Sequence, residues 1–399
     1  MTIELSQAIQ ALAPSATMAM GNAAAELRAA GQSVIDFSMG EPDFDTPAHI
    51  QQAALTALRE GQTHYTPAAG IMKLRAAVAD AYTQAHGIPC EASQVVISCG
   101  AKHALHNAFT VLLNDGDEVL IPAPYWVSYA EQVKLARATP VIVSTKESEN
   151  FKLSAEQLDA ACTNKTRLLV LCSPSNPTGT VYAREQLTAI AEVVQRRKLT
   201  VISDEIYEYL VYPGHEFHSF ATVAPGLEDQ TVIVNGVSKS FAMTGWRIGW
   251  TIAPKNVSAG IAKLQSQETS NPSSISQFAA LAAIEGSKDC VKDMVAEFTR
   301  RKDYVAERLN ALPNVSHGEM GGAFYAFFNV RNYFGKSFRG QTVKNSQDFC
   351  LELLRQQNVA TVSGAAFGAD GFVRASFAAS MENLREGYDR LARFLASAE

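Results

Sequence analysis

The sequence has few of the residues that build disulfide frames, zinc sites or membrane spans. Its 399 residues include six cysteines, none of them in a C-x-x-C pair or close to a histidine cluster. We therefore expect reduced thiols, as in the cytoplasm. No apolar run approaches the roughly 18 residues of a membrane helix. The segment around Glu4 lacks a basic stretch leading into an apolar run, so no secretory signal is expected.

Charge is modest and spread along the chain. The 34 Lys and Arg residues nearly balance the 40 Asp and Glu residues, which gives a net charge of −6. Without a basic block, a nucleic-acid partner is not expected.

No G-x-G-x-x-G pattern follows a first strand, so NAD binding is not indicated. The length and the 47% hydrophobic content suit two domains with cores of their own.

The middle of the chain alternates short apolar, β-branched runs with amphipathic patterns such as 102–113 and 184–197. This alternation predicts an α/β fold with a large, doubly wound, mostly parallel sheet whose faces are covered by helices. The predicted strands are 95–98, 118–121, 140–144, 167–172, 200–203, 231–235 and 247–252.

The C-terminal third has a different pattern. Residues 290–312 predict one long helix that ends at Pro313, and a last helix starts at Ser380. Two short strand-like pieces lie between them, at 323–330 and 371–377. We interpret this part as a smaller α+β domain.

Residues 234–250 contain the most informative lysine. An apolar strand breaks at a turn of small residues, presents Lys239, and is followed eight residues later by Arg247. Partial burial favours the neutral amine, which can form a Schiff base with an aldehyde. Pyridoxal phosphate (PLP) is the common aldehyde cofactor, and its phosphate needs a cation such as Arg247. The alternative is an ordinary surface lysine on a loop.

Two further segments place polar groups after predicted strands. Gly100 lies in a turn of small residues before a helix, where free N–H groups suit a phosphate, although an ordinary strand-to-helix turn has the same pattern. Asp204 follows an apolar strand and would need a cation such as a pyridinium if buried; a surface Asp–Glu pair is the alternative. Ligands of doubly wound sheets bind outside the carboxyl ends of the strands, where Gly100, Asp204 and Lys239 are expected.

Several segments together resemble the class I aminotransferases, which are PLP-dependent enzymes of fold type I. The resemblance is strongest to the bacterial subgroup Ib aspartate aminotransferases. The matching segments are 14–17, 38–44, 63–70, 98–105, 122–129, 173–179, 201–207, 234–250 and 372–377. The resemblance implies an N-terminal arm (1–12), a large PLP-binding domain (48–290) and a discontinuous small domain (13–47 with 291–399).

The resemblance also implies how the cofactor is held. Lys239 would be the catalytic Schiff-base lysine, Trp126 would stack on the cofactor ring, and Asp204 would bind its nitrogen. Tyr65 would reach the phosphate of the neighbouring subunit, which implies a homodimer with shared active sites. Gly236 stands where many relatives have a phosphate-binding serine. The implied cofactor-binding residues are Tyr65, Gly100, Ala101, Lys102, Trp126, Asn176, Asp204, Tyr207, Ser238, Lys239 and Arg247.

For the substrate, the resemblance implies that Arg374 and Gly40 hold the α-carboxylate. Residues 269–272 contain no arginine for a distal carboxylate, and Lys102 occupies the position that serves this purpose in subgroup Ib. Ala13 stands where some members that accept prephenate carry a lysine. The implied substrate-binding residues are Ser15, Thr17, Gly40, Lys102, Trp126, Asn176 and Arg374, and no metal is implied.

The function expected from the resemblance is a PLP-dependent transamination of L-aspartate and 2-oxoglutarate to oxaloacetate and L-glutamate. Lys239 would move the proton, and the kinetics would be ping-pong. Alternatives that use the same cofactor residues are a broad-specificity, aromatic or prephenate aminotransferase and a PLP-dependent lyase. A non-catalytic effector-binding domain on this fold is a further alternative from another class.

Overall fold

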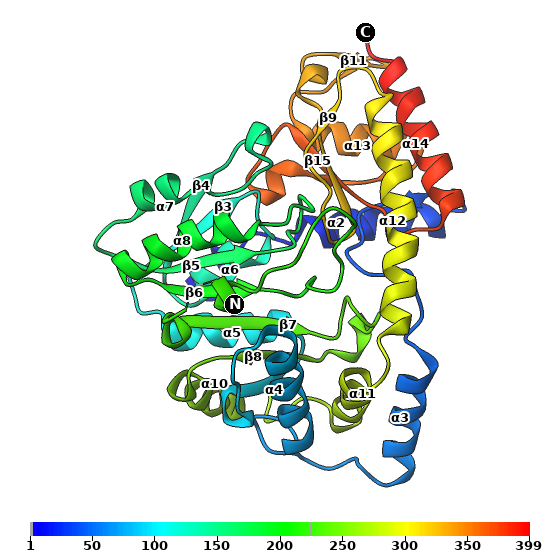
Figure 1. Ribbon diagram of the computed structural model, residues 1–399. Helices are drawn as coiled ribbons and strands as arrows, with labels where there is room; N and C mark the ends of the chain where they lie inside the picture. Colours follow the sequence, from blue (N-terminus) through cyan, green and yellow to red (C-terminus); the bar gives the residue numbers. More distant parts are fainter. Residues whose placement is uncertain (1–2, 224) are drawn as a thin grey trace.

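The computed structural model describes residues 3–223 and 225–399 and is built around a seven-stranded sheet (Figure 1). Along this sheet β8 is antiparallel to its neighbours β2 and β7, and the other pairs are parallel. The doubly wound, mostly parallel sheet is therefore confirmed. In spatial order the strands are β2 (Val95–Ser98), β8 (Gly249–Ile252), β7 (Thr231–Gly236), β6 (Thr200–Asp204), β5 (Thr166–Cys172), β3 (Glu118–Ala123) and β4 (Thr139–Ser144).

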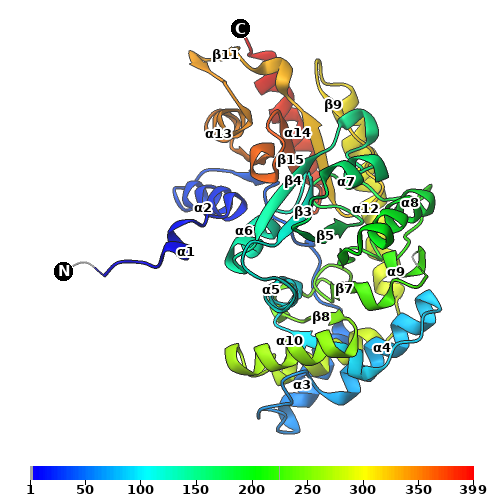
Figure 2. The ribbon, with the colours of Figure 1, turned by 90° about the vertical axis from the view of Figure 1, so that its left-hand side faces the viewer.

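Strand residues alternate between two apolar cores because successive side chains point to opposite faces. Val96 packs in the core beside α5 (Ala101–Leu112), whereas Val95 and Ile97 pack in the core that includes α4 (Met72–His86) and α11 (Ser274–Glu285). Figure 2 shows α5 and α6 (Ser128–Leu135) on one side of the strands, and α8 (Arg184–Arg197) and α9 (Phe220–Val223) on the other. Helices on both faces explain why these strands are nearly continuous apolar runs.

A second, four-stranded antiparallel sheet lies beside the long helix α12 (Asp289–Asn310) and near the C-terminus (Figure 1). Its strands, in order, are β14 (Val362–Ser363), β15 (Phe372–Ser376), β10 (Tyr325–Asn329) and β9 (Ser316–His317). The helix α13 (Ser346–Gln357) packs on β14 and β15, and α14 (Met381–Ala396) packs against α12 and α13. No helix of the described ranges is long and apolar enough to cross a membrane.

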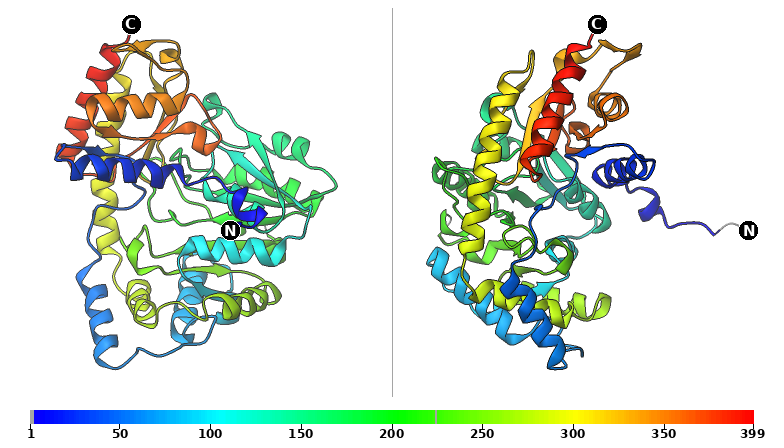
Figure 3. Two further views of the ribbon diagram at one scale, coloured as in Figure 1. Left: turned by 180° about the vertical axis from the view of Figure 1, so that it is seen from behind. Right: turned by 90° about the vertical axis from the view of Figure 1, so that its right-hand side faces the viewer.

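The N-terminal segment packs with the C-terminal elements. Strand β1 (Ile35–Asp36) pairs in parallel with β13 (Val359–Ala360), and Figure 3 shows α2 (Ala16–Ala29) beside the orange and red C-terminal elements. The smaller α+β part is thus discontinuous in sequence, as expected. We propose that the domains follow the bounds 13–47 with 291–399 and 48–290, after an arm at 1–12 whose first two residues lie outside the described ranges.

The predicted strand at 247–252 is wrong at its start. Strand β8 begins at Gly249, because η4 (Thr244–Trp246) ends at Arg247 in a left-handed conformation with φ +55°. This backbone turn takes Arg247 out of the strand and lets its guanidinium lie against the start of α5. The other predicted strands and helices of the large sheet agree with the structure to within one or two residues.

Candidate active site

A cavity of about 340 Å³ opens at the carboxyl edge of the large sheet. Strands β2, β6 and β7 share one direction, so the residues that follow them meet at this edge. The predicted residues that line the cavity are Ser15, Thr17, Gly40, Ala101, Lys102, Trp126, Asn176, Asp204, Tyr207, Ser238, Lys239, Arg247 and Arg374. Residues from widely separated parts of the chain therefore surround one space.

Lys239 lies three residues beyond β7 and is partly buried, as the apolar neighbourhood predicts. Its Nζ donates a hydrogen bond of 2.7 Å to the carbonyl oxygen of Gly40. Burial lowers the pKa of Lys239 to about 8; the Glu41 carboxylate opposes this shift, and the nearby arginines add to it. About a tenth of the amine is therefore neutral at pH 7, and able to act as a nucleophile or base, whereas an ordinary lysine is neutral to less than about 0.1%.

This pKa predicts how Lys239 reacts with acetic anhydride in the PLP-free protein. Only a neutral amine is acetylated, so the rate at Lys239 should rise with pH up to about 8 and then level off. Exposed lysines in the same sample should continue to gain reactivity up to about pH 10.4. Mass spectrometry of the two kinds of peptide measures both rates. Parallel profiles for Lys239 and the exposed lysines would contradict the lowered pKa.

Asp204 is the last residue of β6 and is only 4% exposed. The Tyr129 hydroxyl donates a 2.6 Å hydrogen bond to one carboxylate oxygen, and the Ile206 N–H donates to the other at 3.3 Å. Burial raises the pKa of Asp204 to about 6, against these hydrogen bonds. Within the described ranges no lysine or arginine forms an ion pair with it. A protonated pyridine nitrogen would supply the missing cation, so the site fits PLP.

A phosphate cradle lies at the start of α5. Gly100 caps the helix with φ +84°, and a Cβ atom on it would lie 2.5 Å from Nη2 of Arg247. A Cβ atom on Gly249 would likewise lie 2.3 Å from the backbone nitrogen of Ala101. Gly100 thus leaves room for the Arg247 guanidinium, and Gly249 leaves room for the start of α5. The first N–H groups of this helix lack partners inside the helix. This arrangement suits the phosphate of PLP.

Arg374 is a buried guanidinium, and no carboxylate of residues 3–223 and 225–399 pairs with it. It is 2% exposed, and its Nη1 and Nη2 donate to Asn176 Oδ1 at 3.0 Å and to the Ser38 carbonyl oxygen at 2.6 Å. It lies between the rings of Tyr325 and Phe367, at 4.6 and 5.0 Å from their centroids. Its Nε has no partner among the described residues. A carboxylate bound here would neutralise a buried charge, which otherwise costs free energy.

Several lining residues are not predicted from the sequence. Tyr325, on β10, places its hydroxyl 2.8 Å from that of Tyr207, and Glu41 accepts a 2.8 Å hydrogen bond from Thr244. Tyr129 also reaches the cavity, three residues after Trp126 in the matching segment, a helical spacing that could have signalled it. Glu41 directly follows the predicted Gly40, which could have signalled it, whereas Tyr325 gives no such signal because only tertiary packing brings it to the site.

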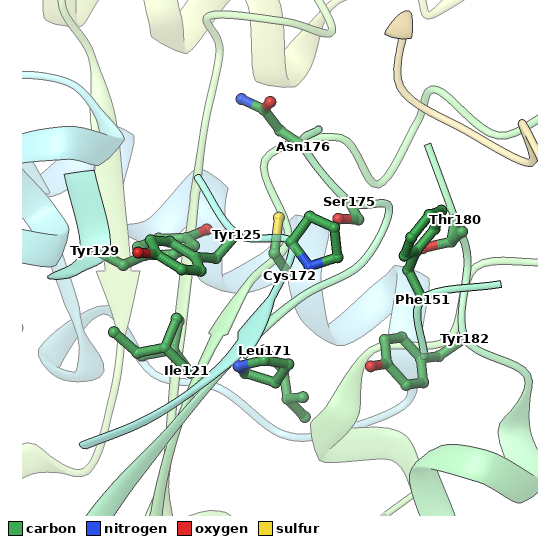
Figure 4. Close-up of a pocket in the computed structure, with 13 residues that line it drawn as sticks. Ile121, Tyr125, Tyr129, Phe151, Leu171, Cys172, Ser175, Asn176, Thr180 and Tyr182 are labelled. Atoms are coloured by element: carbon green, nitrogen blue, oxygen red, sulfur yellow. The ribbon is translucent and has the colours of Figure 1, made fainter. Parts of the chain in front are cut away.

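A smaller cavity of about 20 Å³ lies behind the site and shares Tyr129, Cys172 and Asn176 with it. Figure 4 shows Tyr125 and Tyr129 on one side of Cys172, and Thr180 and Tyr182 on the other.

Tyr65 lies outside both cavities and is 89% exposed. Its role toward a neighbouring subunit stays a prediction.

The sheet topology, together with a cavity at its carboxyl edge that is lined by Asp204, Lys239 and two arginines, is typical of the PLP-dependent enzymes of fold type I. A family model described as aminotransferase class I and II matches residues 32–391, and the chain belongs to this family. The expectations of an aminotransferase and of PLP as its cofactor are therefore confirmed.

Individual relatives match over the whole chain. A bifunctional aspartate aminotransferase and glutamate/aspartate-prephenate aminotransferase of Petunia hybrida is 46% identical over 99% of this chain and 83% of its own length. An aspartate aminotransferase of Streptomyces avermitilis is 44% identical over 99% of this chain and 97% of its own. The crystal structure of the aspartate aminotransferase of Rhizobium meliloti superposes with a TM-score of 0.96 at 39% identity, covering all of both chains.

Proposed function

We propose that the chain transfers the amino group of L-aspartate to 2-oxoglutarate, giving oxaloacetate and L-glutamate. The observation that carries this proposal is that the cavity holds two cations besides Lys239 and Arg247. These are Arg374, which is buried, and Lys102, which is exposed. Both substrates carry two carboxylates, and each cation can bind one of them. The names of the Streptomyces and Rhizobium relatives support the same reaction.

When bound, PLP supplies an aldehyde that bonds to amines and a ring that accepts the electron pair left on the substrate Cα. The chain's own residues do the rest. Arg374 binds the α-carboxylate as a planar fork, with its guanidinium already fixed by Asn176 and Ser38. The neutral Lys239 Nζ takes the proton from the substrate Cα, and Asp204 keeps the ring nitrogen protonated.

The remaining residues orient the cofactor. We propose that Arg247, Gly100, Ala101 and Ser238 hold its phosphate, that Trp126 stacks on its ring, and that Asn176 and Tyr207 bind its phenolic oxygen. These residues line the cavity apart from Gly100, which touches Arg247. Ser15 and Thr17 line the same cavity and offer hydroxyl contacts to the substrate.

Replacing Lys102 by alanine tests the choice of substrate. Its Nζ lies 5.0 Å from the centroid of the Trp126 ring, at the rim of the cavity. If Lys102 binds the distal carboxylate, kcat/KM for aspartate and glutamate should fall by about 10- to 100-fold. Alanine and phenylalanine, which lack that carboxylate, should change by less than about threefold and serve as internal controls. An equal loss on all four amino acids would assign Lys102 to the phosphate or the fold.

Prephenate is a second candidate substrate, because the Petunia relative is named for it as well. Position 13 favours aspartate alone, since Ala13 offers no cation there, and its N–H donates to Glu131 at 3.1 Å. Assaying prephenate as the amino acceptor with glutamate or aspartate as donor decides between the two.

We also propose a homodimer with shared active sites, working in the cytoplasm. The dimer is supported by the exposed Tyr65 and by the apolar Ile3 and Leu5 of the arm, whose side chains are exposed. The cytoplasm is supported by the six free cysteines.

A further inference from the structure

The segment 204–208, which starts at the last residue of β6, carries polar side chains that face two different sites. Asp204 and Tyr207 line the large cavity, whereas Glu205 and Glu208 meet His86, the last residue of α4. One coordinating atom from each of His86, Glu205 and Glu208 lies within 4.8 Å of the other two. This group lies outside the proposed active site and has no part in the reaction described above.

Glu205 is the unusual member of this group because it is buried with one oxygen unsatisfied. It is 1% exposed, and its Oε1 accepts from the Ser203 hydroxyl, the Ser219 hydroxyl and the Phe220 N–H at 2.8–3.2 Å. Its Oε2 has no partner among the described residues. A buried carboxylate oxygen without a donor or cation costs free energy, so a cation bound at this oxygen would stabilise the fold.

The geometry suits a metal ion. The distance from His86 Nε2 to Glu208 Oε2 is 3.6 Å, and both side chains are largely buried. Two ligands with bonds of about 2.1 Å to a tetrahedral ion lie about 3.4 Å apart. An adjoining cavity of about 30 Å³, lined partly by Tyr82 and Trp250, has room for the water that completes the coordination.

We propose that His86, Glu205 and Glu208 form a binding site for a divalent transition-metal ion of the Zn²⁺ type. An imidazole nitrogen with two carboxylates favours such an ion over Mg²⁺ and Ca²⁺, which prefer ligand sets made of oxygen alone. The ion joins the end of α4 to the loop that carries Asp204 and Tyr207. It therefore stabilises the fold behind the PLP pocket and takes no part in the chemistry.

The test adds Zn²⁺ alone to PLP-loaded protein that has been stripped of metal by a chelator, at pH 8. Equilibrium dialysis with metal analysis should find one tightly bound Zn²⁺ per chain, and Ca²⁺ should bind at least about tenfold more weakly. His86→Gln and Glu208→Gln should each weaken Zn²⁺ binding by at least about tenfold. His215→Gln is the matched control, since it removes another partly buried histidine, 3.4 Å from Glu319.

Thermal unfolding supplies a readout that does not depend on activity. Zn²⁺ should raise the Tm of the wild type and of His215→Gln but not that of His86→Gln. This comparison tests the proposed metal site even if Glu208→Gln fails to fold. Absence of stoichiometric Zn²⁺ in the wild type would overturn the proposal. Wild-type affinity in both His86→Gln and Glu208→Gln would overturn it equally, because surface histidines or cysteines would then hold the ion.

Discussion

Replacing Lys239 by alanine is expected to lower the transamination rate by about 10⁴-fold or more. The variant loses the only group in our account that both bonds to the cofactor and moves the substrate proton. PLP should still bind without a covalent bond, because Arg247, Gly100 and Asp204 remain in place. Single-turnover kinetics with aspartate measure the rate, and borohydride treatment followed by mass spectrometry should find no PLP attached to the chain.

The matched control is Lys288→Ala. Lys288 is another partly buried lysine, with its Nζ 5.1 Å from the centroid of the Phe241 ring, but it does not line the cavity. Its loss should change kcat by no more than a few-fold. Near-wild-type turnover in Lys239→Ala would show that another residue carries the reaction.

Asp204→Asn is expected to have the second-largest effect. Removing one partner of a buried ion pair costs about 3–5 kcal/mol, because the other charge is left without compensation. Here that charge is the pyridinium, so kcat should fall by about 10²- to 10⁴-fold. The amide oxygen of the new side chain can accept from the Ile206 N–H, and its NH2 group can donate to the Tyr129 hydroxyl oxygen, which argues for retained folding.

Asp370→Asn is the control for this variant. It removes a carboxylate that accepts hydrogen bonds from Ser346 and Gly371 and lies outside the cavity. Measuring both kcat and Tm for the two variants distinguishes a loss of catalytic rate from a loss of folding stability. A kcat loss in Asp204→Asn no greater than in Asp370→Asn would exclude the proposed role of Asp204.

The large sheet could be predicted from the sequence because its inner strands are buried on both faces. Val95–Ser98 and Thr231–Gly236 are entirely buried, and each contains an unbroken run of three β-branched apolar residues. The positions of Asp204 and Lys239 follow from the same logic, since each stands at or just after the end of such a strand. The left-handed Arg247 could not be predicted, because its conformation depends on its fit against Gly100.

The substrate side of the site depends on long-range packing. Arg374 hydrogen-bonds the Ser38 carbonyl 336 positions away, and no periodicity in either segment indicates this contact. Only the resemblance to the aminotransferase family indicates Arg374 and Gly40 as substrate-binding residues. Neither periodicity nor the resemblance indicates Tyr325. It contacts Tyr207 and Arg374, but its sequence context is that of an ordinary core tyrosine in a strand. The pairing of His86 with Glu205 and Glu208 is hidden in the same way.

The most direct test of the account is the absorbance spectrum of the PLP-loaded wild type during each half of the reaction. Aspartate alone should remove the yellow band of the lysine-bound aldehyde, and 2-oxoglutarate should then restore it, because the amino group moves to the cofactor and on to the acceptor. Lys239→Ala should not show this cycle. A yellow protein that ignores aspartate would contradict the proposed substrate, and a protein that cannot be loaded with PLP would contradict the central role of Lys239.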